Sequence, residues 1–317
     1  MKVLVTGATG FVGRSVVAQL LEAGNRVTAL ARDPARASGL FGDGVAVLRG
    51  DVLDSDSLAA ACTGVDAIIH LAAVIRESGH AQTFSRVNVD GTRNVLNAAA
   101  ASGVGRVMYA STVGAVDDPH LHYMRSRWLA ERLVQDSGIP FSILRFSVAF
   151  GEGDEFINPL AAMVKALPIA PVPGDGSARF QPIAVGDAAR CLVTALYLDR
   201  ALGATYDLGG PQYITYHDLM KLAGEAVGSR ALLLNTPMPI MKAMVRIMER
   251  VMKRPPATSE QLKMLDLDSV AELDSVSRAF GFEPISMQGN LGYVRKMSLW
   301  DAIRINLGGM PGHIRDH

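Results

Sequence analysis

Residues 1–13 read MKVLVTGATGFVG, and this stretch decides how the rest of the chain is interpreted. Its first half is rich in β-branched residues and carries no charge after the lysine, which predicts a buried strand. An apolar helix is expected to follow at residues 14–23. Gly7 permits a tight turn, Gly10 allows a pyrophosphate to approach the backbone, and Gly13 lets helix and strand pack closely. The stretch therefore predicts a dinucleotide site at a helix N-terminus, and the alternative is an ordinary strand-to-helix turn.

Strand and helix patterns alternate through the first half of the chain. The expected strands are residues 2–6, 26–31, 45–48, 67–70, 107–111 and 141–145, and further helices are expected at 57–61, 84–102 and 124–137. This alternation predicts an α/β fold with a doubly wound parallel sheet covered on both faces. Past Gly151, prolines break the rhythm. We expect a dinucleotide-binding domain at 1–150 and a smaller substrate or partner lobe at 151–317, from which some elements can return to the first domain.

The composition is that of a globular chain with no dominant charge. Of the 317 residues, 49% are hydrophobic, and 31 Lys and Arg balance 31 Asp and Glu, so no global field attracts nucleic acid. We expect a small-molecule substrate instead. Cys62 and Cys191 lie in apolar contexts without metal-ligand spacing, which predicts no metal site and fits a reducing compartment. The first strand starts at residue 2 and no run of about 18 apolar residues follows, so we expect a cytoplasmic protein.

The end of the second expected strand bears on which dinucleotide binds. An NAD-binding unit places a carboxylate against the ribose 2′-hydroxyl there, whereas this chain reads Ala29-Leu30-Ala31-Arg32-Asp33. The Arg32 guanidinium suits the 2′-phosphate of NADP and can stack on adenine, and Arg14 can add charge nearby. A slip of one residue would put the Asp33 carboxylate in that place. We expect NADP(H) to be favoured over NAD(H).

Eight motifs together resemble the short-chain dehydrogenase/reductase superfamily, and more narrowly its extended and atypical members. They are VTGATGFVGR (5–14), ALARDP (29–34), GDVLD (50–54), HLAA (70–73), VNVDGTRNVLNAA (87–99), YAST (109–112), ILRFSVAFGEGD (143–154) and YDLGGPQYITYHDL (206–219). The blend is most similar to the group of the NADPH-binding accessory subunit of mitochondrial complex I and bacterial proteins labelled nucleoside-diphosphate-sugar epimerases. The resemblance covers about residues 1–225 and implies a Rossmann-type sheet.

The resemblance also implies a set of cofactor contacts. Asp51 and Val52 would flank the adenine, residues 71–73 would line the cofactor by backbone, and Ser111 and Thr112 would border the nicotinamide. The full set of expected cofactor-binding residues is Gly7, Thr9, Gly10, Phe11, Val12, Gly13, Arg32, Asp51, Val52, Leu71, Ala72, Ala73, Ser111, Tyr123 and Arg127.

The catalytic motif departs from the superfamily pattern, which is a tyrosine with a lysine four residues on. Here Tyr123 is followed by Arg127. In the family the lysine holds the nicotinamide ribose and favours the phenolate; Arg127 keeps the charge but directs its donors differently. Thr112 matches the hydroxyl that polarises a carbonyl, yet Tyr123 follows it by only eleven positions, a shorter loop than in sugar-nucleotide members. The expected catalytic residues are Thr112, Tyr123 and Arg127; the alternative is an exposed Tyr and Arg on a helix.

Three further polar residues have structural and functional interpretations. His70 is expected to be a core or rim histidine. Asn88 either relays protons or braces the fourth strand, or makes a simple helix hydrogen bond. Asp187 is expected to be the N-cap of a helix at 188–198.

Residues 237–254, PMPIMKAMVRIMERVMKR, predict a basic, Met-rich amphipathic helix. Packing on the chain's own core is the ordinary interpretation. Contact with a membrane surface, with a protein groove or with an apolar substrate stays open, and with it a peripheral location at a membrane.

These observations leave alternative functions. The first is an NADP(H)-binding oxidoreductase or isomerase acting on a small carbonyl or hydroxyl compound, with an apolar compound as one option. The second is a non-catalytic NADPH-binding structural or sensing subunit, by analogy with the complex I relative. A nucleoside-diphosphate-sugar epimerase or dehydratase is a weaker alternative. The sequence leaves the oligomeric state open.

Overall fold

The computed structural model describes residues 1–252, 255–265 and 267–315. The chain divides into two compact units that do not follow the chain order. The first unit is Met1–Phe146, Val185–Leu208 and Ser275–Phe282, and the second is Ser147–Ala184, Gly209–Asp274 and Glu283–His317. The chain therefore returns twice to the first unit after leaving it.

A seven-stranded sheet forms the centre of the first unit, and every pair of neighbouring strands in it is parallel. Its strands are β1 (Lys2–Thr6), β2 (Arg26–Ala31), β3 (Val45–Arg49), β4 (Ala67–His70), β5 (Arg106–Thr112), β6 (Phe141–Phe146) and β11 (Ala204–Leu208). They lie in the order β11-β6-β5-β4-β1-β2-β3. The order reverses next to β1, so the carboxyl ends of β1 and β4 meet at the switch point where such sheets bind ligands. The predicted doubly wound parallel sheet is confirmed.

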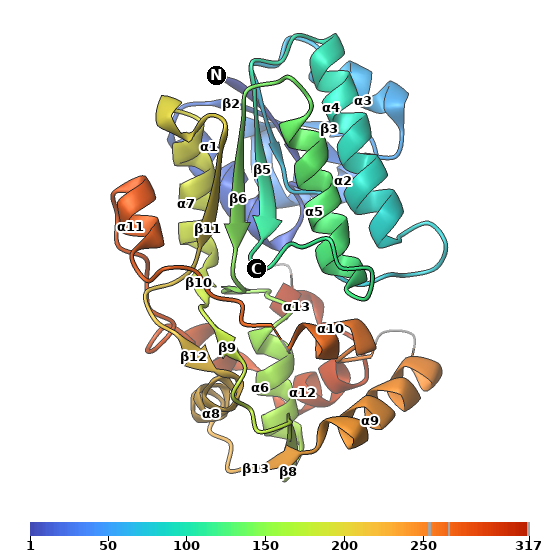
Figure 1. Ribbon diagram of the computed structural model, residues 1–317, viewed down its shortest axis with the longest axis vertical. Helices are drawn as coiled ribbons and strands as arrows, with labels where there is room; N and C mark the ends of the chain where they lie inside the picture. Colours follow the sequence, from blue (N-terminus) through green and yellow to red (C-terminus); the bar gives the residue numbers. More distant parts are fainter. Residues whose placement is uncertain (253–254, 266, 316–317) are drawn as a thin grey trace. The chain divides into compact units, whose positions relative to one another are not determined.

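Helices cover both faces of this sheet (Figure 1). They are α1 (Phe11–Glu22), α2 (Pro34–Phe41), α3 (Ser55–Cys62), the π-helix η2 (Phe84–Asp90), α4 (Gly91–Ala101), α5 (His122–Gln135), α7 (Val185–Ala195) and α11 (Ser275–Phe280), with 3-10 turns η1 (Gly42–Gly44) and η3 (Asp199–Ala201). Helices α1 and α7 pack side by side on one face, and α4 and α5 lie on the other. Leu4, Ile68 and Tyr109 of the sheet pack there with Val95 and Val134 of the helices. Burial on both faces explains why the strands read as continuous apolar runs.

Two helix predictions require correction. The helix after Ala184 starts at Val185, so Asp187 lies inside its first turn and is not its N-cap. A carboxylate in the first turn still complements the helix dipole. The predicted helix at 84–102 is a π-helix through Asp90 that continues as α4 from Gly91. Such π-segments are frequent at functional sites.

The second unit combines short sheets with a helical core. Its elements are β7 (Ala149–Phe150), α6 (Ile157–Ala166), β8 (Ile169–Pro173), β9 (Arg179–Phe180), β10 (Ile183–Ala184), β12 (Ile214–Thr215), α8 (Tyr216–Ala226), β13 (Leu232–Thr236), α9 (Met238–Val251), α10 (Ser259–Met264), the 3-10 helix η4 (Gly292–Lys296), α12 (Leu299–Asn306) and α13 (Gly312–Arg315). Strands β7 and β10 pair parallel, β8 and β13 parallel, and β9 and β12 antiparallel. Helix α6 packs against both α8 and α12. Among the described helices of both units, none combines the length and apolar character needed to cross a membrane.

Candidate functional site

The glycine turn between β1 and α1 has the geometry that its spacing predicts. Gly7 has a positive φ of 71°, which favours glycine, and its carbonyl accepts from the Gly10 N–H at 3.0 Å. A Cβ on Gly13 would lie 2.2 Å from the Gly7 carbonyl oxygen and 2.7 Å from that of Ala8. Only a residue without a side chain lets α1 approach the turn this closely.

The start of α1 offers a cradle for an anion. Its N-cap is Gly10, and within the described chain no side chain caps the helix there. Gly10 is exposed, and a Cβ on it would meet, among described atoms beyond its chain neighbours and the helix backbone, the Gly7 carbonyl oxygen at 3.1 Å. Uncapped N–H groups and the positive helix end suit a pyrophosphate. The predicted contacts Thr9 and Gly10 are exposed, Phe11 and Val12 are half-buried, and Gly13 is buried.

The carboxyl end of β2 separates the roles of two adjacent charged residues. Strand β2 ends at Ala31, and Arg32 follows it as an exposed side chain. Asp33 caps α2, because its carboxylate accepts from the Arg36 N–H at 3.2 Å. The guanidinium is thus the first charged group after the strand, and the carboxylate is engaged by a helix. Both residues follow the strand end at which sheets of this kind bind the adenosine ribose of a dinucleotide.

The loop after β4 lies directly against the glycine turn. The Leu71 N–H donates to the Thr6 carbonyl at 3.1 Å, and the Ala72 N–H approaches the Thr6 hydroxyl at 3.4 Å. A Cβ on Gly7 would lie 2.8 Å from the Ala72 nitrogen. The structure therefore brings Leu71 and Ala72, which are half-buried, and the exposed Ala73 to the turn.

Asp51 and Val52 follow β3, in the loop that leads to α3. The Asp51 carboxylate, half-buried, accepts from the Leu53 N–H at 3.0 Å. Val52 is buried, and its carbonyl accepts from the Asn94 side chain at 3.0 Å. Both residues are fixed by neighbouring elements, and they lie one strand beyond Arg32 in the sheet.

His70, at the end of β4, is a buried neutral residue. Its Nδ1 lies 2.6 Å from the Thr6 hydroxyl and its Nε2 lies 3.0 Å from the Thr92 hydroxyl. The Thr92 hydroxyl donates its hydrogen to the Asn88 carbonyl, so it can only accept from His70. Nε2 of His70 therefore carries the hydrogen, and Nδ1 accepts from the Thr6 hydroxyl. Burial, aided by the nearby positive charge of Arg127, lowers the pKa of His70 to about 3. The histidine therefore ties β1 and β4 to α4.

Asn88 braces the loop after β4 against α5. It is fully buried in the π-helix, and its amide makes reciprocal hydrogen bonds with the backbone of Val74, at 2.8 Å and 3.1 Å. The same amide nitrogen donates to the Ser126 hydroxyl at 2.9 Å. Of the interpretations that the sequence leaves open, the structure supports the bracing one. The brace holds the predicted cofactor loop beside the helix that carries Tyr123.

The carboxyl end of β5 carries two hydroxyls in different situations. Ser111 donates to the carboxylate of Glu131, which is buried and also receives two hydrogen bonds from Arg145, at 2.9 Å and 2.6 Å. Arg145 in turn lies 3.6 Å from the Asp207 carboxylate. Among the described residues, the Thr112 hydroxyl has one long contact, 3.4 Å to the Val113 carbonyl. The Thr112 hydroxyl is therefore less engaged by the protein than that of Ser111.

Helix α5 packs against β5 and carries Tyr123, Arg127 and Glu131 at four-residue spacing, hence along one side. Tyr123 is half-buried, with its ring 5.6 Å from that of Phe84 in an edge-on arrangement. Arg127 is only 4% exposed, donates to the Ala110 carbonyl and lies 4.9 Å above the Tyr109 ring. The alternative of an exposed arginine on this helix is therefore wrong.

Among the described residues, the buried Arg127 has no carboxylate for its charge and no acceptor for one of its donors, Nε. A buried cation of this kind is unfavourable unless another group compensates it. The hydroxyls of a nucleotide ribose are acceptors of the required kind, so the residues present fit a bound NAD(P). Arg127 and the glycine turn would hold it, and Arg32 would meet its adenosine end.

Several residues that hold the candidate site in place were not predicted from the sequence. The buried Glu131 forms an ion pair with the half-buried Arg145 next to Ser111, and Thr6 and Thr92 fix the tautomer of His70. The four-residue spacing from Tyr123 through Arg127 was the one signal that could have identified Glu131.

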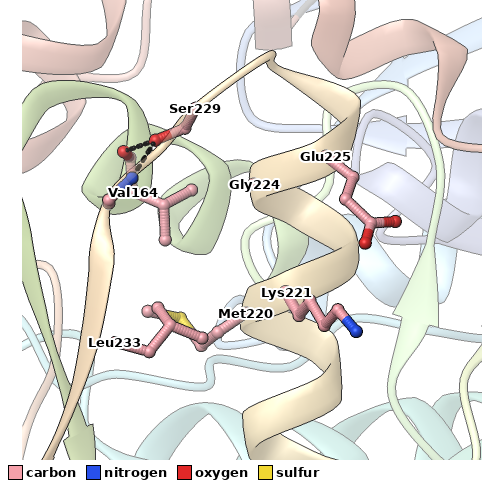
Figure 2. A pocket seen from close by; sticks show the side chains of 8 residues that line it. Val164, Met220, Lys221, Gly224, Glu225, Ser229 and Leu233 are labelled. Carbon is pink, nitrogen blue, oxygen red and sulfur yellow. Dashed lines mark hydrogen bonds between the residues drawn. The ribbon is translucent and has the colours of Figure 1, made fainter.

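A separate apolar pocket lies within the second unit (Figure 2). It is lined by Val164, Met220, Lys221, Gly224, Glu225, Ser229, Ala231 and Leu233. Ser229 donates to the Val164 carbonyl at its rim, while Lys221 and Glu225 extend from α8 away from Leu233. All predicted catalytic and cofactor residues belong to the first unit, whereas the residues that line this pocket belong to the second.

Comparison with known proteins agrees with this site. The profile of the NAD dependent epimerase/dehydratase family matches residues 3–209. NADH dehydrogenase (ubiquinone) 1 alpha subcomplex subunit 9, mitochondrial, of Arabidopsis thaliana is 30% identical over 278 residues, 85% of this chain and 68% of the relative. The 2-alkyl-3-oxoalkanoate reductase of Stenotrophomonas maltophilia is 27% identical over 330 residues, 94% of this chain and 99% of the relative.

Solved structures share the fold and include complexes with both cofactors. The NADPH-dependent quinone oxidoreductase QOR2 of Escherichia coli, in complex with NADPH, has a TM-score of 0.74 at 21% identity, covering 92% of this chain and 99% of that one. MoeE5 in complex with UDP-glucose and NAD has a TM-score of 0.70 at 23% identity, covering 92% and 96%. The resemblance inferred from the motifs is confirmed. The chain belongs to the NAD dependent epimerase/dehydratase family, within the extended short-chain dehydrogenases/reductases, and is an NAD(P)-binding protein.

Proposed function

We propose that the chain is an NADP(H)-dependent oxidoreductase acting on a small carbonyl or hydroxyl compound of apolar character. The observation that carries the proposal is the buried Arg127, a cation with an unused donor, on the same side of α5 as Tyr123 and against the strand that carries Thr112. The switch point of the sheet puts the glycine turn at the same edge. A proton donor, an oxygen-binding hydroxyl and a nucleotide cradle are thus available together.

Each residue has a distinct part in this chemistry. The bound cofactor would supply or accept a hydride. Thr112 orients the substrate oxygen, since its hydroxyl has only a long local contact, whereas that of Ser111 is taken by Glu131. Tyr123 exchanges a proton with that oxygen, and Arg127 holds ribose while its charge favours the phenolate. Glu131 keeps Ser111 and Arg145 in place behind this group.

The preference for the phosphorylated cofactor rests on Arg32. Arg32 is the first charged residue after the strand, and Asp33 has the separate role of capping α2, which supports NADP(H) over NAD(H). Arg32→Ala should reduce the affinity for NADPH by about 1.5–3 kcal/mol, the scale of a charge-assisted contact, and leave that for NADH almost unchanged. Arg26→Ala, at the opposite end of the same strand, is the matched control. Calorimetry with both cofactors measures the difference, and equal affinities in the parent protein would overturn this preference.

The catalytic part is tested at Tyr123. Tyr123→Phe should retain NADPH binding and lose turnover by about 10² or more, the usual effect of removing a positioned acid or base. Tyr197→Phe, which loses an exposed phenol in the same unit, should keep both. Arg127→Lys restores the pair that is usual in the superfamily and should retain or raise activity. Thermal shift with NADPH follows binding, and NADPH oxidation with quinones, enones and keto-sugars follows chemistry.

A second candidate is a non-catalytic NADPH-binding subunit. The arginine at position 127 favours it, and so does the likeness to the Arabidopsis complex I subunit. It predicts strong stabilisation by NADPH, no consumption with any substrate of the panel, and no effect of Tyr123→Phe beyond the lost hydroxyl. Sugar-nucleotide epimerisation remains the weaker alternative, and a UDP-sugar in the panel tests it. Turnover that depends on Tyr123 with any of these compounds would exclude the non-catalytic candidate.

A further inference from the structure

Helix α9 carries two separate rows of apolar side chains. One row, Met241 and Val245, is buried against Leu262 of α10, and Met238 and Met248 pack at its margin. The other row is exposed: Ile240 by 53%, Met244 by 40%, Ile247 by 64% and Val251 by 78%. We call these four residues the α9 stripe. The ordinary interpretation of the helix as a packed element thus accounts for only one of its rows.

The spacing of the α9 stripe makes it continuous. Its members are four, three and four positions apart, so at about 100° per residue they fall within roughly 60° of one another around the helix. From Ile240 to Val251 the stripe runs about 17 Å along the axis. This is about half the thickness of a bilayer core, so the stripe suits a helix that lies along a surface.

Positive charge lies on the side of the stripe away from the buried row, where Arg250 and Arg246 are exposed, about 60° and 100° around the helix from Ile247. Lys242 is also exposed but lies about 140° from Ile247, next to the buried row. The single acidic residue of the helix, Glu249, is turned to α10, where its carboxylate accepts from the Ser259 backbone at 2.7 Å and hydroxyl at 2.6 Å. Lys253 and Arg254, the last two residues of the predicted helix, lie outside the described residues. The exposed surface of α9 is therefore apolar with a basic margin.

The strand that leads into α9 adds further exposed apolar side chains. Leu232 and Leu234 of β13, and Ile169, which is paired with Leu232 in β8, are each more than half exposed. Only Pro237 separates β13 from α9. Residues 229–252 contain four basic residues and one acidic residue, Glu249. This whole segment therefore combines apolar exposure with positive charge.

We propose that α9 docks on a membrane surface that contains anionic lipids. The α9 stripe would enter the boundary between headgroups and acyl chains, and Arg250 and Arg246 would contact the lipid phosphates. Charge complementarity is the reason for choosing this occupant, because a neutral apolar partner would leave these two cations beside the stripe without counter-charges. Long side chains such as Arg can bury their stems while their charged ends stay in the headgroup layer.

The proposal is tested by flotation of the full-length protein with two kinds of vesicle, one of phosphatidylcholine and one with about a third phosphatidylglycerol. Binding is expected to the anionic vesicles. Ile247→Ser/Val251→Ser should weaken it by more than tenfold, because two large side chains no longer enter the boundary. Arg246→Gln/Arg250→Gln should weaken it by about 30-fold, the effect of two lost cations near an anionic surface.

Matched variants separate docking from general effects. Leu48→Ser removes an exposed apolar side chain of the first unit, and Arg295→Gln/Lys296→Gln removes two exposed cations elsewhere in the second unit. Both should bind like the parent, and thermal shift with NADPH shows that each variant is folded. Equal binding of the parent to both vesicles, no binding to either, or unchanged binding of both α9 variants would overturn the proposal. So would a parent dimer in solution that the Ile247→Ser/Val251→Ser variant dissociates, since the stripe would then face a second copy.

Discussion

The neutral, buried His70 makes the stability of the first unit dependent on pH in a direction that can be worked out. Its pKa is lowered from the ordinary 6.5 to about 3, mainly by burial and secondarily by the charge of Arg127. In the unfolded chain the imidazole takes a proton near pH 6.5, whereas in the folded protein it stays neutral down to about pH 3. The contribution of the neutral His70 to the free energy of unfolding is therefore fully present above pH 6.5 and is lost as the pH falls below that value. The loss is about 1.4 kcal/mol per pH unit, hence about 2 kcal/mol at pH 5.

The substitution His70→Gln tests this reasoning because glutamine can donate and accept like the neutral imidazole but does not titrate. We expect it to reduce the change in unfolding free energy between pH 7 and pH 5 by about 2 kcal/mol, whatever it costs at pH 7. Urea unfolding in a Trp300→Phe background leaves Trp128 of α5 as the single tryptophan, so its fluorescence reports on the first unit. His122→Gln, at the exposed start of α5, controls for the loss of one imidazole. Identical pH dependences of the parent and His70→Gln would refute the account of a neutral buried histidine.

Two further predictions follow from packing and exposure. Gly13→Ala should abolish NADPH binding and cost several kcal/mol of stability, because its Cβ would overlap the Gly7 carbonyl oxygen at 2.2 Å; Gly39→Ala, in α2 with nothing within 4 Å, should stabilise by about 0.5–1 kcal/mol. Denaturant unfolding and calorimetry compare the two, and a Gly13→Ala protein that binds NADPH normally would contradict the close packing. Mild peroxide should oxidise the exposed Met244 before Met108, which is fully buried in β5. Bound anionic vesicles should slow the oxidation of Met244 and leave that of Met108 unchanged. Peptide mass spectrometry gives the order, and equal rates without vesicles would contradict the exposure of the α9 stripe.

Strands β1, β2 and β4 were predicted from the sequence with their observed bounds, and β3, β5 and β6 to within one residue at each end. A continuous apolar run between turn residues is a strong local signal. Strand β11 was missed because Ala204–Leu208 lies at the edge of the sheet, where alternate positions face solvent and polar residues are tolerated. Helix α2 was missed because it is short and its start depends on the Asp33 cap.

The candidate site also has parts that were predictable from the sequence and parts that were not. The glycine turn and the position of Arg32 follow from local spacing, which a sequence displays. The ion pair of Glu131 with Arg145 and the hydrogen bond from His70 to Thr92 join residues that are far apart in the chain, so no local pattern announces them. The burial of Arg127 belongs with these, since it depends on how α5 packs against β5.

Because the chain returns to the first unit, this unit can be completed only late in synthesis, and a fragment of the chain that ends early cannot reproduce it. Strand β11 pairs with β6, and the Arg190 guanidinium lies 4.0 Å over the ring of Phe282, so the unit lacks parts until residue 282 has been made. At roughly 5–20 residues per second, a ribosome needs on the order of ten seconds to add the chain that separates Phe146 from that point. Until Leu208 has been added and β11 can pair, β6 is an open edge, exposed to chaperones or to a neighbouring nascent chain. A fragment ending near residue 150 would keep that edge permanently, so a soluble version of the nucleotide-binding unit has to be built by joining its three segments.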